Sequence, residues 1–110
     1  MILALVRDLL LSSKVTGAAK AQGIAMGLVR DPSKLAGTTG DLLLVDLNLD
    51  GAIEAAGTWK RDAETRRVIG FVQHTDIAAI EAARAAGIDQ IMPRGAFFDS
   101  LDQILTNANR

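Results

Sequence analysis

The sequence predicts a three-layer α/β sandwich built on a doubly wound, five-stranded parallel sheet. Five short apolar runs, each bounded by turn or charged residues, supply the strands: Ile2–Val6, Ile24–Val29, Leu42–Leu47, Val68–Val72 and Gln90–Met92. The first four do not alternate apolar with polar residues, which is typical of parallel strands covered by helices on both faces. Helical patterns lie between and after these runs, so strands and helices alternate along the chain.

Most of the predicted helices show apolar residues at three- and four-residue spacing. The residues that carry these patterns are, in chain order, Val15, Ala18, Ala19 and Gln22; Ile53, Ala56 and Trp59; Ile77, Ile80, Ala83 and Ala86; and Phe97, Phe98, Leu101, Ile104 and Leu105. Gly23 and Gly87 are predicted to end their helices, and Thr75 is predicted to be an N-cap. We interpret Trp59 as a packing residue of its helix.

The segment Asp31–Gly40 departs from this regular alternation. It contains Pro32, Gly37 and Gly40 and leaves room for little more than one helical turn. The second helix of the sandwich is therefore predicted to be shortened, with the rest of the connection a loop.

Length and composition exclude several classes of function. A chain of 110 residues that is 49% hydrophobic is expected to fold as one domain over residues 1–110. The net charge of −1 argues against a nucleic-acid partner, and the absence of cysteine excludes a disulfide scaffold, a zinc ribbon and a thiol nucleophile. No apolar stretch approaches the roughly 20 residues of a membrane span, and no secretion signal is recognisable. We therefore expect a cytoplasmic domain with no membrane partner.

Polar residues gather where the predicted strands end. Arg7 and Asp8 follow the first strand, Asp46 and Asn48 end the third, and Arg94 follows the fifth. The carboxyl ends of parallel strands meet at one edge of the sheet, where ligands of such folds bind. This edge is the predicted functional site, although the sequence has no dinucleotide-binding glycine motif, Walker loop or nucleophile elbow. His74, in the turn after the fourth strand, is interpreted as an exposed loop residue.

In the order and spacing of these features the chain resembles the receiver domains of response regulators, over nearly its whole length. The run LLLVDLNLDG, Leu42–Gly51, resembles the third strand of the family, with Asp46 at the phospho-accepting aspartate. The run AARAAGIDQIMPRG, Ala82–Gly95, resembles the fourth helix and fifth strand, with Arg94 at the position of the family's lysine. The resemblance implies a flavodoxin-like (CheY-like) fold.

The resemblance also implies a chemistry. Receivers accept a phosphoryl group from a phosphohistidine, with a magnesium ion bridging the acceptor and phosphoryl oxygens. At the matching positions, Asp8 and Asp46 would be the carboxylate ligands of Mg²⁺ and Asn48 would supply its backbone oxygen. The implied partners are signalling proteins, either a histidine kinase or a downstream effector.

Three positions depart from the family's pattern. Arg7 stands where the family has an acid, which predicts weak or absent cation binding unless the guanidinium itself pairs with Asp46. Arg94 keeps the charge of the lysine without its geometry and is interpreted chiefly as an ion-pair partner of the two acids. The family's hydroxyl residue after the fourth strand falls on Val72 or Gln73, so the usual readout of phosphorylation is missing.

These departures favour a stand-alone, degenerate receiver-like domain (a pseudo-receiver) of bacterial signal transduction that acts through protein–protein interaction, not as an enzyme. The first alternative is a receiver that is phosphorylated on Asp46 with Mg²⁺ and then dephosphorylates itself. The second alternative is a small α/β module that binds an anion at Asp8, Asp46 and Arg94. The predicted partner surface, including a homodimer contact, is the last helix with Phe97, Phe98 and Leu101.

Overall fold

The computed structural model describes residues 1–109 and contains one parallel sheet with the strand order β2-β1-β3-β4-β5. The strands are β1 (Ile2–Leu5), β2 (Met26–Val29), β3 (Leu42–Asp46), β4 (Arg67–Val72) and β5 (Gln90–Pro93). All four neighbouring pairs are parallel, and β1 and β3, at the centre, are buried at every residue. The sheet therefore confirms the predicted doubly wound architecture.

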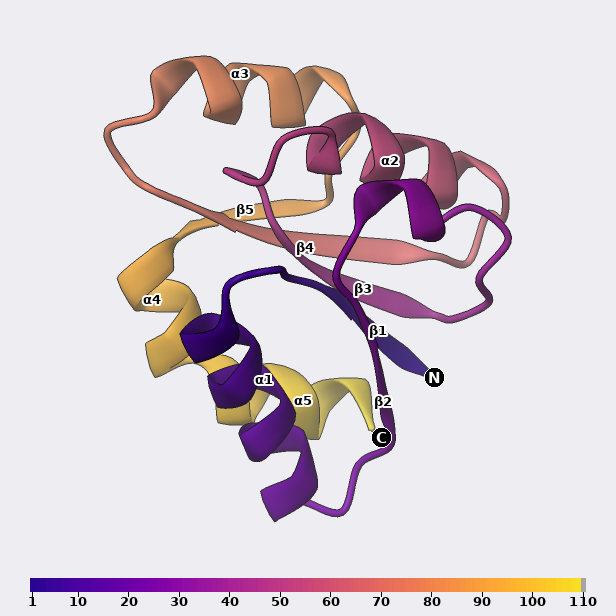
Figure 1. The fold of residues 1–110 in the computed structure, drawn as a ribbon, viewed down its shortest axis with the longest axis vertical. Coiled ribbons are helices and arrows are strands. Elements are labelled where there is room, and N and C mark those ends of the chain that lie inside the picture. Colours follow the sequence, from indigo (N-terminus) through magenta and orange to yellow (C-terminus); the bar gives the residue numbers. More distant parts are fainter. Residues whose placement is uncertain (110) are drawn as a thin grey trace.

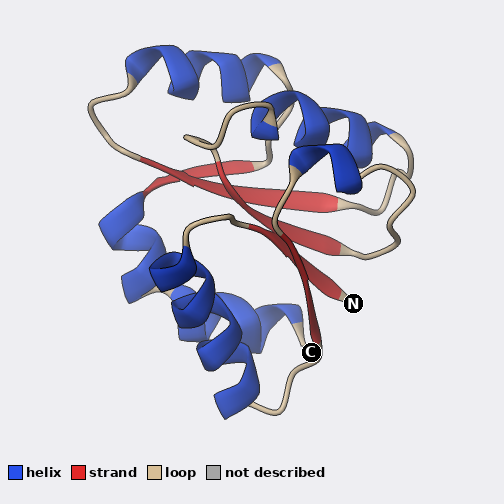
Figure 2. Cartoon of the chain, viewed as in Figure 1, coloured by secondary structure: helices blue, strands red, loops and turns tan. Residues whose placement is uncertain are grey.

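Helices cover both faces of the sheet (Figures 1 and 2). One face carries α1 (Leu9–Ala21), α4 (Arg94–Asp99) and α5 (Leu101–Ala108), and the other carries η1 (Pro32–Lys34), α2 (Ala52–Arg61) and α3 (Ile77–Ala85). The shortened second helix is confirmed, because the link between β2 and β3 holds only the 3₁₀ turn η1. Within residues 1–109, no helix is long and apolar enough to span a bilayer.

Two helix details differ from the sequence-based predictions. The N-cap of α3 is Asp76 and not Thr75, since the Asp76 side chain accepts a hydrogen bond from the Ala79 N–H at 3.1 Å. The last helix is also divided, with α4 and α5 meeting at Ser100, whose backbone (φ −99°, ψ 0°) departs from helical values.

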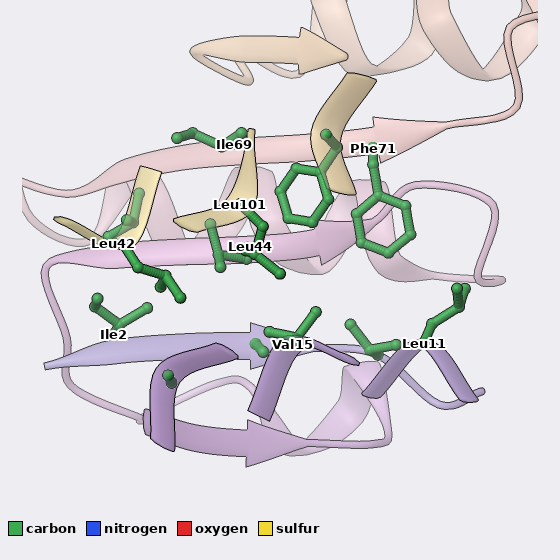
Figure 3. Close-up of a cluster of buried hydrophobic side chains, with 13 residues drawn as sticks. Ile2, Leu11, Val15, Leu42, Leu44, Ile69, Phe71 and Leu101 are labelled. Carbon is green, nitrogen blue, oxygen red and sulfur yellow. The ribbon is translucent and has the colours of Figure 1, made fainter. Parts of the chain in front are cut away.

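The core under α1, α4 and α5 gathers the apolar residues of one sheet face (Figure 3). Phe71 of β4 packs against Phe97 with ring centroids 4.7 Å apart and against Phe98 at 5.3 Å. Phe97 is 0% exposed and Leu101 4%, whereas Phe98 is half-buried at the edge of this core. The assignment of Phe97 and Leu101 to a partner surface was therefore wrong, because the core takes up their apolar area.

The core on the other face centres on Trp59, which is 1% exposed. Its indole Nε1–H donates to the carbonyl of Thr38 at 3.1 Å, and the Arg66 guanidinium lies 4.5 Å from the ring centroid. Leu35, just after η1, is fully buried in the same core. A single turn and one inserted leucine thus cover part of the sheet where a longer helix would otherwise pack.

The register of β3 and β4 fixes the start of the loop that follows Asp46. Asp46 pairs with Phe71, and the Leu47 N–H donates to the Phe71 carbonyl at 2.9 Å. The Leu47 side chain then lies over Gly70, where an added Cβ would come within 2.6 Å of the leucine Cδ1. Glycine at position 70 therefore allows the Leu47 side chain to pack directly on the backbone of β4.

Candidate functional site

The candidate site lies at the carboxyl edge of the sheet, where the loops after β1, β3 and β5 come together. Asp46 ends β3, Asp8 caps α1 after β1, and Arg94 begins α4 after β5. The charges of Asp8 and Arg94 both act on the Asp46 carboxyl. The structure therefore brings the two predicted carboxylates and the predicted guanidinium to one site.

Asp46 is the most buried charged residue of this edge, with 7% of its surface exposed. Its Oδ1 accepts a hydrogen bond from the Asn48 N–H at 3.0 Å. Burial raises the pKa of the Asp46 carboxyl above its usual range and the Asp8 charge adds to this, while the Asn48 N–H and Arg94 act in the opposite direction. The Asn48 N–H and Arg94 therefore offset only part of the cost of burying the ionised Asp46 carboxylate.

Asp8 is already engaged in the local structure of α1. Its Oδ1 accepts from the Leu11 N–H at 2.9 Å, which makes it the N-cap of the helix, and the residue is exposed. A carboxylate at this position is favoured by the unpaired N–H groups of the first turn. Helix capping therefore accounts for Asp8 without a metal ion.

Arg7 lies away from Asp46. Its Nε–H donates to the Arg30 carbonyl at 3.3 Å, and its Nη2 lies 4.0 Å from an Asp31 carboxylate oxygen. The side chain is 59% exposed. The alternative that Arg7 pairs with Asp46 is not realised, because the chain after β2 brings Arg30 and Asp31 close to Arg7 and these two residues contact its guanidinium.

Arg94 is half-buried, and its Nε is a buried atom without a hydrogen-bond partner in the described chain. The ion pairs within 4.0 Å among residues 1–109 join Met1 to Asp41, Arg7 to Asp31 and Lys60 to Asp89. The prediction of a direct ion pair between Arg94 and the two acids was therefore wrong. The guanidinium acts on Asp46 through its field, which lowers the pKa of that carboxyl without offsetting burial.

The side chain of Asn48 joins the loop after β3 to the loop after β4, a contact that the sequence did not predict. Its Oδ1 accepts from the Gln73 N–H at 2.9 Å, and its Nδ2 donates to Asp76 Oδ2 at 2.7 Å. The resemblance to receiver domains implied a role only for the backbone oxygen of Asn48. Asparagine and aspartate are common in turns, so the two residue types alone carry no signal that they pair across 28 positions.

The two positions that match the family's hydroxyl residue have different surroundings. Val72 ends β4 and is 1% exposed, whereas Gln73 follows it and is exposed. His74 is exposed in the same turn, in agreement with its interpretation as a loop residue. Neither matched position therefore supplies a hydroxyl to the site.

The donor set of the edge favours only weak binding of a magnesium ion. The donors are two carboxylates, each with one oxygen engaged by a backbone N–H, and the Asn48 backbone oxygen. No cluster of three acidic or histidine side chains that could hold a metal occurs in residues 1–109. The fixed charge of Arg94 offsets one carboxylate, so the net charge facing a dication is about −1, which favours only weak binding.

The raised pKa of Asp46 gives a prediction about stability. The folded protein binds the proton of the Asp46 carboxyl more tightly than the unfolded chain does. The free energy of unfolding therefore falls as pH rises from the ordinary carboxyl pKa through the raised pKa of folded Asp46. Asp46→Asn is expected to raise the free energy of unfolding at pH 7 by on the order of 1 kcal/mol, and the gain should disappear below the ordinary carboxyl range. Urea unfolding at pH 7 and at acidic pH measures this, and a less stable variant at pH 7 would contradict it.

Comparison with known proteins supports the fold. No protein-family model and no curated protein matches the sequence. Among solved structures, the BeF3-activated receiver domain of DrrB aligns with a TM-score of 0.81 and 15% identity, over 99% of this chain and 97% of that one. The phosphorylated cyanobacterial phytochrome response regulator RcpA aligns at 0.75 and 17%, over 98% and 89%. The Mn²⁺-bound response regulator Rcp1 aligns at 0.74 and 18%, over 94% and 89%.

These likenesses extend over nearly the whole chain. Its sheet has the strand order β2-β1-β3-β4-β5, and the 3₁₀ turn η1 stands where the second helix was predicted. The identities of 15–18% show a common architecture. The chain therefore has the flavodoxin-like fold of response-regulator receiver domains.

Proposed function

We propose that this chain is a degenerate receiver-like domain of cytoplasmic signal transduction, which acts by binding signalling proteins and does not run magnesium-dependent phosphorylation. One observation carries the proposal: Asp46 is buried beside a single capping carboxylate and a half-buried arginine, with Arg7 where the family has a second acid. The structural neighbours, which are response regulators, support a role in signalling.

Electrostatics explains why the chemistry would fail. Transfer of a phosphoryl group to an aspartate needs an ionised nucleophile and a cation that neutralises the incoming phosphoryl oxygens. Burial raises the pKa of Asp46, and Arg94 competes with any cation for the field of the two carboxylates. The guanidinium of Arg7, although turned away, adds a positive charge at the same edge of the sheet. Each of these effects disfavours the metal-bound reactive state.

A magnesium titration with a charge-reversed variant tests the proposal. Backbone amide shifts of Asp8, Asp46 and Asn48 should not change with millimolar Mg²⁺ in the unmodified protein. Arg7→Asp restores an acid and changes the local charge by two units, so Mg²⁺ affinity should rise about tenfold or more. Arg84→Asp, with the same charge change in the last turn of α3, is the matched control and should leave the affinity unaltered. Submillimolar Mg²⁺ binding by the unmodified protein would contradict the proposal.

A second candidate function is a receiver that is phosphorylated on Asp46, and the orientation of Arg7 favours it. Because Arg7 contacts Asp31 and Arg30, its side chain does not block Asp46 or Asp8. In that reaction an Asp46 oxygen would bond to the phosphorus of a phosphohistidine while the phosphorus–nitrogen bond breaks and imidazole leaves. The Arg94 guanidinium, whose Nε has no hydrogen-bond partner within residues 1–109, would then lie near the phosphoryl oxygens.

A further inference from the structure

A chain of hydrogen bonds runs from Asp46 to the first turn of α3. The Asn48 N–H donates to Asp46 Oδ1 at 3.0 Å, and the Asn48 side chain donates to Asp76 Oδ2 at 2.7 Å. The other oxygen of Asp76 accepts from the Ala79 N–H at 3.1 Å and so caps the helix. The bonds connect the end of β3, the loop after it and the start of α3 without a gap.

The orientation of the Asn48 amide is fixed by its partners. Its oxygen faces the Gln73 N–H, which can only donate, and its nitrogen faces the Asp76 carboxylate, which accepts when ionised. A flipped amide would place two donors together at Gln73 and two acceptors together at Asp76. The bond between Asn48 and Asp76 is partly buried, so water competes only weakly for it, whereas the bond from the Gln73 N–H is exposed.

The Asn48 side chain is the hydrogen-bonded bridge between the two loops. Within the described chain, the last backbone hydrogen bond between the β3 and β4 segments is that from Leu47 to Phe71. Beyond it, the hydrogen bonds that join the loop after Asp46 to the loop before α3 are the two made by the Asn48 amide. A change in the position of Asn48 therefore acts on Gln73 and Asp76 directly, through these two hydrogen bonds.

We propose that Asn48 is a positioning residue that couples the Asp46 side chain to the start of α3. Loss or replacement of the Asp46 oxygen that accepts from the Asn48 N–H releases the loop, and the Asn48 amide then changes its hold on Gln73 and on the α3 cap. Ile77, the first residue of α3, is 60% exposed, so this route ends at an apolar surface residue. The inference goes beyond the proposed function, because the coupling needs neither a metal ion nor a phosphoryl group.

Amide NMR of the full chain tests the coupling. Asp46→Ala should change the shift and the hydrogen-exchange rate of the Ala79 amide in the otherwise unmodified protein. In the Asn48→Ala background, which keeps the Asn48 backbone N–H but removes both side-chain bonds, the effect of Asp46→Ala on Ala79 should fall at least about threefold. Asn48→Ala alone should speed exchange of the Gln73 amide about fivefold, as expected for the loss of one exposed hydrogen bond of about 1 kcal/mol.

Two further variants complete the test. Gln73→Ala is the matched control, because it removes an exposed side chain and keeps the backbone N–H that Asn48 accepts; the effect of Asp46→Ala on Ala79 should persist in it. Asp76→Asn keeps a good N-cap but places an amide nitrogen against the Asn48 amide nitrogen. It should therefore reduce the effect of Asp46→Ala on Ala79, as Asn48→Ala does. Asp76→Asn takes the place of Asn48→Ala in the test if Asn48→Ala does not fold. An equal response of Ala79 in all backgrounds would overturn the proposal, whatever the outcome of phosphorylation assays.

Discussion

Phe97→Ala is expected to lower the free energy of unfolding by about 3–5 kcal/mol. Phe97 is fully buried, and its ring lies 4.7 Å from that of Phe71 and 5.0 Å from that of Phe98. Its removal would leave a cavity between β4 and the two C-terminal helices. Domains of this size have a total stability of about 5–15 kcal/mol, so the loss is a large fraction of the whole.

Phe98→Ala is the comparison for this prediction. Phe98 belongs to the same aromatic cluster but is half-buried, with the Lys14 ammonium 5.4 Å from its ring centroid. We expect a loss of about 1–2 kcal/mol, since less apolar surface leaves water and solvent can fill the site. Urea unfolding followed by far-ultraviolet circular dichroism measures both variants. Equal losses would contradict the assignment of Phe97 to the core.

Trp59→Ala is expected to cost a similar amount, about 3–5 kcal/mol, on the opposite face of the sheet. The change removes the largest buried side chain of that face and the Nε1 hydrogen bond to Thr38. It also removes the ring over which the Arg66 guanidinium lies. The same denaturation experiment applies, with circular dichroism as the signal because Trp59 is the one tryptophan of the sequence.

Trp59→Phe separates the hydrogen bond from the packing. The Thr38 carbonyl also accepts from Arg66 Nη2 at 3.2 Å, so loss of the indole N–H does not leave this oxygen unsatisfied. We therefore expect a loss of about 1–2 kcal/mol, mostly from reduced packing. A loss as large as that of Trp59→Ala would show that the indole N–H, and not the ring volume, holds the segment around Thr38.

The sequence predicted the architecture because the apolar patterns are local and strong. Doubly apolar strands indicate a covered parallel sheet, and the apolar spacing from Phe97 to Leu105 predicted an amphipathic helical segment. In the structure Phe97, Leu101 and Leu105 form its inward face, all three being at most 4% exposed. The error was to give Phe97 and Leu101 to a partner. A helical stripe wide enough for the core leaves only its margin, here Phe98, at the surface.

The site was predicted less completely, because it depends on where flexible side chains find partners. The strand ends placed Asp8, Asp46 and Arg94 at one edge, as parallel topology requires. The direction of Arg7 was not predictable, since Arg30 and Asp31 become its neighbours only when β2 pairs with β1. The Asn48–Asp76 bond likewise depends on two loops that meet only in the folded sheet. Short-range patterns carry no information on either contact.

We expect that the altered edge around Asp46 does not support magnesium-dependent phosphorylation. Intact-protein mass spectrometry after incubation with acetyl phosphate tests it most directly, with and without Mg²⁺, beside Asp46→Asn and an active receiver as positive control. We expect no phosphoryl adduct on this protein under conditions in which the control is modified. A magnesium-dependent adduct that is absent from Asp46→Asn would contradict the proposed function and would make the chain a phosphorylatable receiver.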